Sequence, residues 1–345
     1  MRQIGEKQMK TLRHSNIPIF LPQLACPHQC IFCNQNHISS QTNVPTPHEA
    51  QTIIKRNLAT IPQNYDIQIA FFGGSFTCLP LETQESYLQV AQPFIENGSV
   101  SGIRISTRPD YIDDDILRML KRYHVTDIEL GAQSTNNTVL KLSGRGHDKN
   151  AIESASRKIN EYGFNLGLQM MLGLPGDTLE TAQQTARDII AFGAKTTRIY
   201  PTLVVADTPL AKLYTQGKYT PLTLSEAVAW TSRIYTLFIE NNVTVLKVGL
   251  HPNKDFTSNK YLLAGPFHPS VKELVLSDIW HERLKSAMQS TCKNQSINIF
   301  VSENELHNAI GYNSQNRDEL LKSYKHVTFT TDKTLNGYEF TYCHY

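Results

Sequence analysis

The stretch IPIFLPQLACPHQCIFC, residues 17–33, joins a short apolar run to three cysteines that lie within eight residues. Cys26, Cys30 and Cys33 are separated by gaps of three and two residues, whereas the other three cysteines of the chain are scattered singly. The apolar run is typical of a buried β-strand, and the proline and polar residues after it are typical of a loop. Three thiols in one loop, without a fourth nearby, indicate a metal or redox site that keeps one ligand position open.

Composition sets the broad class of the protein. The chain has 345 residues and a net charge of +2, so it can bury a large core, and any basic binding surface must be local. Residues 1–16 are charged throughout and lack the apolar stretch of a signal peptide, and no later run has the roughly 18 apolar residues of a membrane span. We therefore expect a cytoplasmic protein without membrane segments, whose crowded cysteines bind metal and do not form disulfides.

Apolar runs alternate with stretches of helical period from Ile17 onward. This alternation is typical of βα units around a parallel sheet, and each connection is long enough for a crossover helix. The expected strands are residues 17–24, 66–74, 101–107, 125–133, 164–176 and 196–205. Six such units in series favour an α/β barrel, open or closed, over a short open sheet.

The alternation loosens after Val205. Helical and strand segments up to residue 250 are followed by a loop rich in proline and glycine, and the remaining residues favour a small α+β module. The expected division is an N-terminal extension over residues 1–16, a barrel with its helical extension over residues 17–250 and a C-terminal module over residues 251–345.

Polar, turn-rich loops follow five of the expected strands. Their sequences are CPHQC, GGS, STRPD, GAQS and GLPG. Any one of them is ordinary turn chemistry. Parallel α/β folds, however, place their active sites at the carboxyl edge of the sheet. Five such loops at successive strand ends therefore predict a functional site at that edge.

Three thiolates suit two kinds of metal centre. Structural zinc takes four ligands, and His28 or His37 could complete a site of three cysteines and one histidine. A [4Fe–4S] cluster held by three thiolates instead leaves one iron open to a small molecule. Ligand count and spacing favour the cluster, and zinc stays open as an alternative.

CPHQCIFC resembles the C-x3-C-x-φ-C signature of the radical S-adenosylmethionine (SAM) superfamily, with Phe32 in the aromatic position φ. The later strand-end loops resemble the motifs of that family in the same order, so the resemblance covers residues 17–205. It implies a partial (β/α)6 barrel, a [4Fe–4S] cluster on the three cysteines, and SAM bound to the open iron. The residues it implies as SAM ligands are Phe32, Gly73, Gly74, Ser75, Ser106, Gln133, Arg145 and Gln169. The implied reaction is reductive cleavage of SAM to methionine and a 5′-deoxyadenosyl radical, which abstracts hydrogen from a substrate.

GGSFTCLP, STRPDYID, IELGAQS and GRGH together resemble the radical domain of the Elongator catalytic subunit family, which modifies the wobble uridine of tRNA. This resemblance implies a tRNA nucleoside as the substrate and an electron donor such as flavodoxin or ferredoxin. Arg108 and Tyr200, at strand ends on the same edge, are candidates for contact with the substrate. Members of that family carry an acetyltransferase domain after the radical domain, whereas fewer than 100 residues follow the barrel here and show no acetyl-CoA pattern.

One stretch of the C-terminal module bears on RNA. Residues 310–314, followed by a helix, resemble the G-x-x-G loop of K-homology RNA-binding modules, although Ser314 replaces the second glycine. An ordinary helix cap explains the same residues. Two alternatives to a tRNA-modifying enzyme stay open: a radical SAM enzyme that acts on a porphyrin-type or other small molecule, and a zinc-stabilised RNA-binding protein without catalysis.

Overall fold

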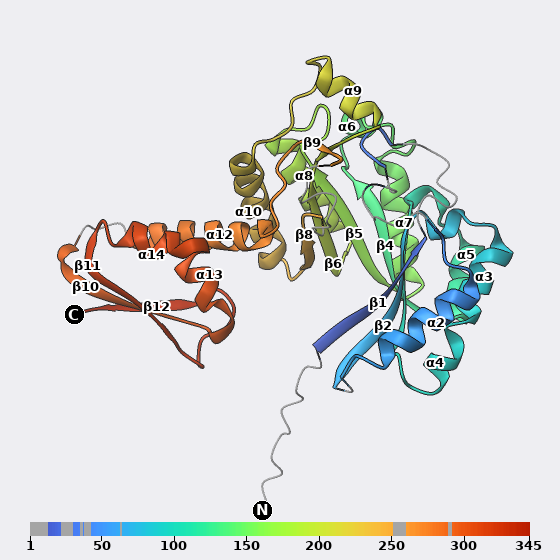
Figure 1. Ribbon diagram of the computed structural model, residues 1–345, viewed down its shortest axis with the longest axis horizontal. Coiled ribbons are helices and arrows are strands. Elements are labelled where there is room, and N and C mark those ends of the chain that lie inside the picture. The colour runs from blue at the N-terminus through green and yellow to red at the C-terminus, as the bar shows by residue number, and fades with distance from the viewer. Residues whose placement is uncertain are drawn as a thin grey trace, which may run out of the picture.

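The computed structural model describes residues 13–21, 30–34, 37, 43–62, 64–250, 260–288 and 292–345. Its main element is a sheet of seven parallel strands in the order β1-β2-β3-β4-β5-β6-β8. The strands are β1 (Arg13–Leu21), β2 (Tyr65–Gly73), β3 (Gly102–Thr107), β4 (Val125–Gln133), β5 (Asn165–Leu172), β6 (Thr196–Pro201) and β8 (Thr244–Val248). Figure 1 shows that the sheet curls into an open barrel with helices on its outer face. The partial α/β barrel is thus confirmed, and β8 adds a seventh strand beside β6.

Helices connect the successive strands. They are α2 (Pro47–Leu58), α3 (Leu81–Gln89), α4 (Gln92–Glu96), α5 (Asp114–Arg122), α6 (Asn137–Leu142), α7 (Lys149–Glu161), α8 (Leu179–Ala191), α9 (Pro209–Thr215) and α10 (Leu224–Glu240). Thr46 and Thr223 each form a capping box with a glutamate three residues later, which satisfies free amides of the first turn. A separate two-stranded ribbon pairs β7 (Val204–Val205) with β9 (Leu262–Ala264). No helix among the described residues is long and apolar enough to cross a membrane.

Alternate residues of each strand point to opposite faces of the sheet. On β3, Ile103 and Ile105 are fully buried in the core between sheet and helices. Arg104 and Ser106 alternate with them, and their side chains reach residues of β4 and β5 on the inner face. We call the space enclosed by the inner faces of these seven strands the lumen; its walls are polar, whereas the outer face of the sheet is apolar.

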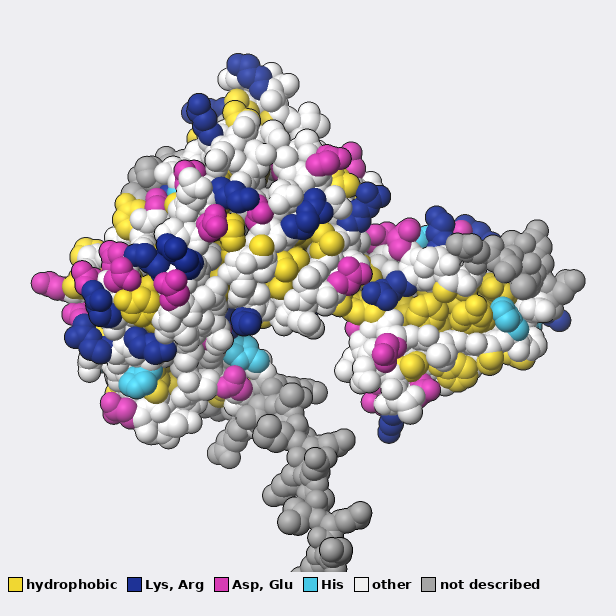
Figure 2. Space-filling view, turned by 180° about the vertical axis from the view of Figure 1, so that it is seen from behind, with side chains coloured by type: hydrophobic (Ala, Val, Ile, Leu, Met, Phe, Trp, Pro, Cys, Tyr) yellow, Lys and Arg dark blue, Asp and Glu magenta, His cyan; other side chains and the backbone are white. Residues whose placement is uncertain are grey.

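A second, smaller core follows the barrel. The strands β10 (Cys292–Val301), β11 (Tyr324–Thr331) and β12 (Phe340–His344) form a sheet in the order β11-β10-β12, on which α13 (Leu306–Ile310) and α14 (Gln315–Leu320) pack. Helix α12 (Val271–Ala287) links the two parts, because Val275 and Ile279 belong to the barrel core and Trp280 and Leu284 to the second core. The predicted C-terminal α+β module is confirmed, and Figures 1 and 2 show it projecting sideways from the barrel.

The stretch that resembles a K-homology loop is packed against α12. Gly311 has a positive φ of 90°, and the amide of Tyr312 donates a hydrogen bond of 2.7 Å to the Ser277 hydroxyl. The buried Asn316 side chain donates to the carbonyl oxygens of Ser277 and Ala309. This loop therefore uses polar groups inside the protein, although Ser314, at the N-cap of α14, makes no side-chain capping hydrogen bond. Contact between the C-terminal module and RNA stays a prediction.

Candidate active site

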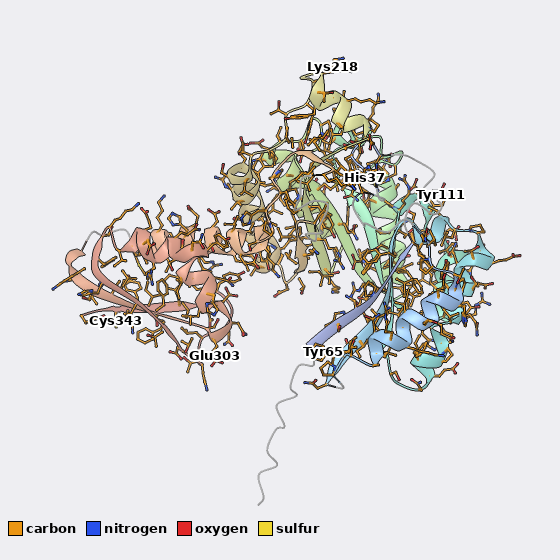
Figure 3. All side chains as sticks on the ribbon, viewed as in Figure 1. His37, Tyr65, Tyr111, Lys218, Glu303 and Cys343 are labelled. Atoms are coloured by element: carbon orange, nitrogen blue, oxygen red, sulfur yellow. The ribbon has the colours of Figure 1, made fainter. Side chains whose placement is uncertain are left out.

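The second half of the cysteine loop, residues 30–34, lies at the carboxyl ends of the strands. Figure 3 shows the neighbouring His37 at this end of the sheet and Tyr65 at the opposite end of β2. The amide of Ile31 donates to the carbonyl oxygen of Ser143 over 3.2 Å, and the amide of Leu210 in α9 donates to that of Ile31 over 2.8 Å. The half-buried Phe32 packs against a small apolar cluster that includes Leu210 and Ala211 of α9. These contacts fix the loop beside the ends of β4 and β6.

Two of the three predicted cluster ligands can be placed. Cys30 is buried and Cys33 is half-buried, both in the anchored part of the loop. The predicted ligands outside the described residues are Cys26 and His28. The Nε2 atom of His37 lies 3.0 Å from a carboxylate oxygen of Asp207, and its ring stacks on Tyr261 with 3.8 Å between centroids. In the described ranges no three histidine, cysteine or acidic side chains gather as a metal site, so a cluster here requires the remaining cysteine of the motif.

Arg145 reaches the cysteine loop. Its Nη1 donates to the Sγ of Cys30 over 3.1 Å, and its Nη2 donates to the carbonyl oxygen of Gly131. The Nε atom of Arg145 is buried and has no hydrogen-bond partner in the part of the chain that the structure describes. Arg145 thus places its positive charge beside a thiol that the sequence predicts as a cluster ligand. The sequence predicts Arg145 at the polar end of SAM; the structure places it on a predicted cluster ligand, with one donor left unpaired.

Arg108 holds the loop that contains Arg145. Its Nε and Nη2 donate to the two carboxylate oxygens of Asp110 over 2.9 and 2.8 Å, and Nη2 also donates to the carbonyl oxygen of Arg145 over 2.5 Å. Burial raises the pKa of Asp110, but the bonds and charge of Arg108 outweigh it and hold that pKa below its ordinary value. The contacts of Arg108 thus position the loop that carries Arg145, and a contact between Arg108 and substrate stays a prediction.

His147 lies beside the two arginines. Burial, with the charges of Arg145 and Arg108, lowers its pKa to about 3, so the ring is neutral at pH 7. Its Nδ1 lies 3.4 Å from Nη2 of Arg108, and no hydrogen-bond partner of its buried Nε2 is found within the described ranges. A neutral histidine adds no further positive charge to this corner, where two guanidinium groups already lie.

The ends of β1, β2 and β3 meet around two glycines. Gly73 has a φ of +110°, and a Cβ there would lie 3.1 Å from the carbonyl carbon of Leu21, so a side chain is not accommodated. The amide of Gly74 donates to the carbonyl oxygen of Leu21 over 2.9 Å. Gly74, Ser75 and Ser106 line one small gap that is too narrow for a water molecule. The structure therefore brings three predicted SAM ligands together, and Gly73 forms the turn that permits their close approach.

Gln133 ends β4 in a strained conformation. Its φ is +69°, which residues with a side chain rarely adopt, and its buried Oε1 has no hydrogen-bond partner among the described residues. An unsatisfied buried polar atom costs roughly 1–3 kcal/mol. Strained backbone persists only where the surrounding structure holds it, and such residues cluster at functional sites. Both costs fall on one residue that the sequence predicts as a SAM ligand, and contact between Gln133 and SAM stays a prediction.

A charged network fills the lumen on the amino-terminal side of this edge. Glu129, which is 1% exposed, accepts from Arg104 over 3.0 Å and from Arg198 over 2.6 and 3.0 Å. Arg104 also donates to Asp127 over 2.8 Å. Burial raises the pKa of Glu129, but Arg198 and Arg104 outweigh it and hold that pKa below its ordinary value. The Gln169 amide donates to Glu129 over 2.9 Å, so this predicted SAM ligand is tied to the network.

Sequence alone did not predict this network, although a signal for it exists. Strands that are buried on both faces are apolar throughout. In this chain Arg104, Asp127, Glu129 and Arg198 instead alternate with apolar residues inside strands of a parallel sheet. Charges at every second position of such strands predict a polar lumen.

Comparisons with known protein families agree with this geometry. Residues 20–189 match the family model described as the Radical SAM superfamily, and residues 194–281 match the Radical_SAM C-terminal domain. The chain belongs to the radical SAM superfamily and is an enzyme of that class. Its cofactors are the [4Fe–4S] cluster and SAM that this superfamily uses.

Within that superfamily the chain is similar to tRNA-modifying proteins over part of its length. It is 26% identical over 248 residues to tRNA uridine(34) acetyltransferase of Methanocaldococcus infernus, which covers 59% of this chain and 46% of that protein. It is 29% identical over 197 residues to Elongator complex protein 3 of Schizosaccharomyces pombe, which covers 50% of this chain and 35% of that protein. The chain thus spans half the length or less of these two relatives.

A solved structure shares the fold. Elp3 of Methanocaldococcus infernus, with residues 1–46 deleted, matches with a TM-score of 0.61 at 20% identity, covering 81% of this chain and 66% of that one. At this identity the likeness concerns the fold alone.

The residues at the carboxyl edge fit the two cofactors. Thiols are the usual ligands of iron–sulfur clusters, and an arginine lies on one of them. The buried Oε1 of Gln133 and Nε of Arg145 are an acceptor and a donor that a bound SAM molecule can satisfy. The turn at Gly73 brings backbone groups within reach of a ligand.

Proposed function

We propose that this enzyme uses the 5′-deoxyadenosyl radical from SAM to abstract hydrogen from a nucleoside of tRNA. The observation that carries the proposal is the arrangement at one edge of the sheet, where the thiol of Cys30 lies beside Arg145, and Arg145 and Gln133 both carry buried polar atoms without partners. Similarity to a tRNA uridine(34) acetyltransferase and to Elongator complex protein 3 supports tRNA as the substrate. This substrate implies a cytoplasmic location.

Each predicted residue has a role in the proposal. Cys26, Cys30 and Cys33 hold the cluster, which supplies one electron for SAM cleavage after a donor such as flavodoxin or ferredoxin has reduced it. The residues proposed to hold SAM are Phe32, Gly73, Gly74, Ser75, Ser106, Gln133, Arg145 and Gln169. Arg108 and Tyr200 are proposed contacts to the substrate or its surroundings.

The protein itself supplies orientation and exclusion of water. The paired charges around Glu129 form a rigid floor for the lumen, because each carboxylate there is held by at least one arginine. Phe32 and Leu210 close the outer side of the cysteine loop. These walls would hold bound SAM and keep water away from it, which would limit side reactions.

Metal analysis of the anaerobically purified protein tests the centre. We expect about four irons and four sulfides per chain, and formation of 5′-deoxyadenosine when SAM and a strong reductant are added. One zinc per chain without iron would overturn the proposal in favour of a zinc-stabilised RNA-binding protein.

Binding of tRNA tests the substrate. We expect a gel shift of tRNA at low salt that weakens as salt rises, because phosphate contacts release counterions. We also expect a modified nucleoside that is present in tRNA from cells with this protein and absent without it. If no tRNA binds at low salt and the nucleosides are identical, the tRNA proposal fails and a porphyrin-type or other small molecule takes its place.

A further inference from the structure

Lys247 faces the lumen from the edge strand β8. Its Cα is the register partner of Arg198 on the neighbouring β6, and partners on adjacent strands point to the same face of the sheet. Arg198 reaches Glu129 of β4, so this shared face is the inner one. The Lys247 side chain is half-buried. It therefore lines the lumen on the β6–β8 side.

The charges of the lumen balance without Lys247. Arg104 and Arg198 are paired with Asp127 and Glu129 over distances of 2.6 to 3.0 Å. Burial, and next the charge of Arg198, lower the pKa of Lys247, and among the described residues no acid opposes them or forms an ion pair with it. A half-buried cation is costly without a counterion. The lumen therefore carries one positive charge that the described side chains leave uncompensated.

Tyr200 adds a hydrogen-bond donor to the same side. It lies two residues after Arg198 on β6, so its side chain is on the same, inner face of the sheet. A tyrosine hydroxyl can donate its proton to an acceptor in the lumen. Burial raises the pKa of Tyr200, so the hydroxyl keeps its proton at pH 7.

We propose that Lys247 and Tyr200, on the inner face of β8 and β6, form an oxyanion site that holds a phosphate or carboxylate group of the substrate. Ammonium and hydroxyl groups are suitable donors to both. The proposed SAM ligands come from the cysteine loop and from β2 to β5 with their following loops, which leaves the β6–β8 side for the substrate. This inference rests on the proposed function and extends it: for a nucleoside of tRNA, the bound group is the phosphate of the modified nucleotide.

Thermal unfolding of the full-length, cluster-loaded protein in phosphate tests the site. Inorganic phosphate, compared with chloride at equal ionic strength, is expected to raise Tm in a saturable way, because it binds the folded state alone. Lys247→Gln is expected to weaken the apparent phosphate affinity at least tenfold, and Lys247→Arg to keep it within about threefold. The matched control is Lys218→Gln, an exposed lysine after α9 that lies away from the sheet in Figure 3 and should behave as wild type.

A second variant keeps the test valid if Lys247→Gln does not fold, and further ligands identify the bound group. Tyr200→Phe removes only the hydroxyl and is expected to weaken phosphate binding about threefold even if Lys247→Gln does not fold. If uridine 5′-monophosphate raises Tm and uridine does not, the site binds phosphate. If only acetate gives a saturable rise in Tm, the site binds carboxylate.

The site is overturned if phosphate and acetate give no saturable shift in the wild-type protein, or if wild type, Lys247→Gln and Tyr200→Phe bind equally well. Failure of the wild-type protein to cleave SAM would instead overturn the proposed function and leave the anion-binding result standing.

Discussion

Two parts of the barrel interior differ in whether their buried polar groups have hydrogen-bond partners. Around Glu129 the charged side chains are paired, with Arg104, Arg198 and Gln169 all donating to the same carboxylate. At the carboxyl edge, Gln133 holds a buried oxygen that has no partner. Stable proteins satisfy their buried polar groups. The paired region therefore belongs to the framework of the fold, and the unpaired region contains the residues that we propose as SAM ligands.

The unpaired atoms are concentrated at the site. Eight buried side-chain atoms in the described part of the chain lack a hydrogen-bond partner, and four of them belong to Gln133, Ser143, Arg145 and His147. The last three share the short loop on which the cysteine loop is anchored. A random scatter of unsatisfied groups does not produce such a cluster, which makes the contrast with the Glu129 network testable by substitution on each side.

Replacing Cys30 is expected to have the largest effect at the site. Cys30→Ser removes one of three thiolates from the cluster, so we expect loss of iron and complete loss of SAM cleavage. Both are measured on anaerobically purified protein. Cys343→Ser, at an exposed cysteine of β12 labelled in Figure 3, is the control and should retain both properties. Retained cleavage by Cys30→Ser would contradict the assignment of the cluster.

Replacing Glu129 is expected to have the largest effect on the framework. Glu129→Gln leaves Arg104 and Arg198 without their shared carboxylate, and breaking a buried ion pair costs about 3–5 kcal/mol of unfolding free energy. Urea unfolding measures the loss. Glu161→Gln, at an exposed residue of α7, should change stability by less than about 0.5 kcal/mol. A loss below about 1 kcal/mol for Glu129→Gln would mean that water screens the network, and the contrast between the two regions would disappear.

Sequence predicted the edge of the barrel better than its interior. The cysteine motif and the glycine turn at Gly73 are local patterns, and parallel strands carry such patterns to one edge whatever their exact register. The bond between Glu129 and Arg198 joins residues 69 positions apart and depends on strand register. In the same way, sequence predicted Arg145 at the correct edge, but its contact with Cys30, 115 positions away, depends on how two loops pack.

We expect the stability of the protein to depend on pH through His147. Because its pKa is lowered to about 3 from 6.5, the unfolded chain binds more protons than the folded one between these values. The contribution of His147 to the free energy of unfolding is therefore fully present above pH 6.5. It falls as the pH drops towards 3, by up to about 1.4 kcal/mol per pH unit. We expect wild type to lose about 2 kcal/mol more than His147→Asn between pH 7 and pH 5 in urea unfolding.

The control for this pH effect is His326→Asn, at an exposed histidine of β11, which should follow the wild-type pH dependence. Asp110 acts in the same direction, but only below its ordinary pKa of 3.8, so it does not contribute in this window. An identical loss in wild type and His147→Asn would show that the histidine titrates freely and that its corner is open to solvent.

Gln133→Gly is expected to give the smallest change in stability of these substitutions. It distinguishes the carboxyl edge from the Glu129 network, because it should weaken SAM binding without destabilising the fold. Glycine adopts a positive φ without strain, and the substitution removes the unpaired Oε1. These gains offset the entropy cost of glycine, so we expect the unfolding free energy to stay unchanged or to rise by up to about 1 kcal/mol. Equilibrium dialysis under anaerobic conditions should show SAM binding weakened about tenfold, because the amide bonds to SAM are lost.

Asn242→Gly separates the backbone effect from the ligand effect. Asn242 also has a positive φ, of 56°, but it is exposed in the turn before β8. Both glycine variants therefore relieve left-handed strain, and only Gln133→Gly removes a proposed SAM ligand. If the two variants bind SAM equally well, the unpaired oxygen of Gln133 has no ligand to satisfy. A loss of several kcal/mol in Gln133→Gly would place this glutamine in the framework, together with Glu129.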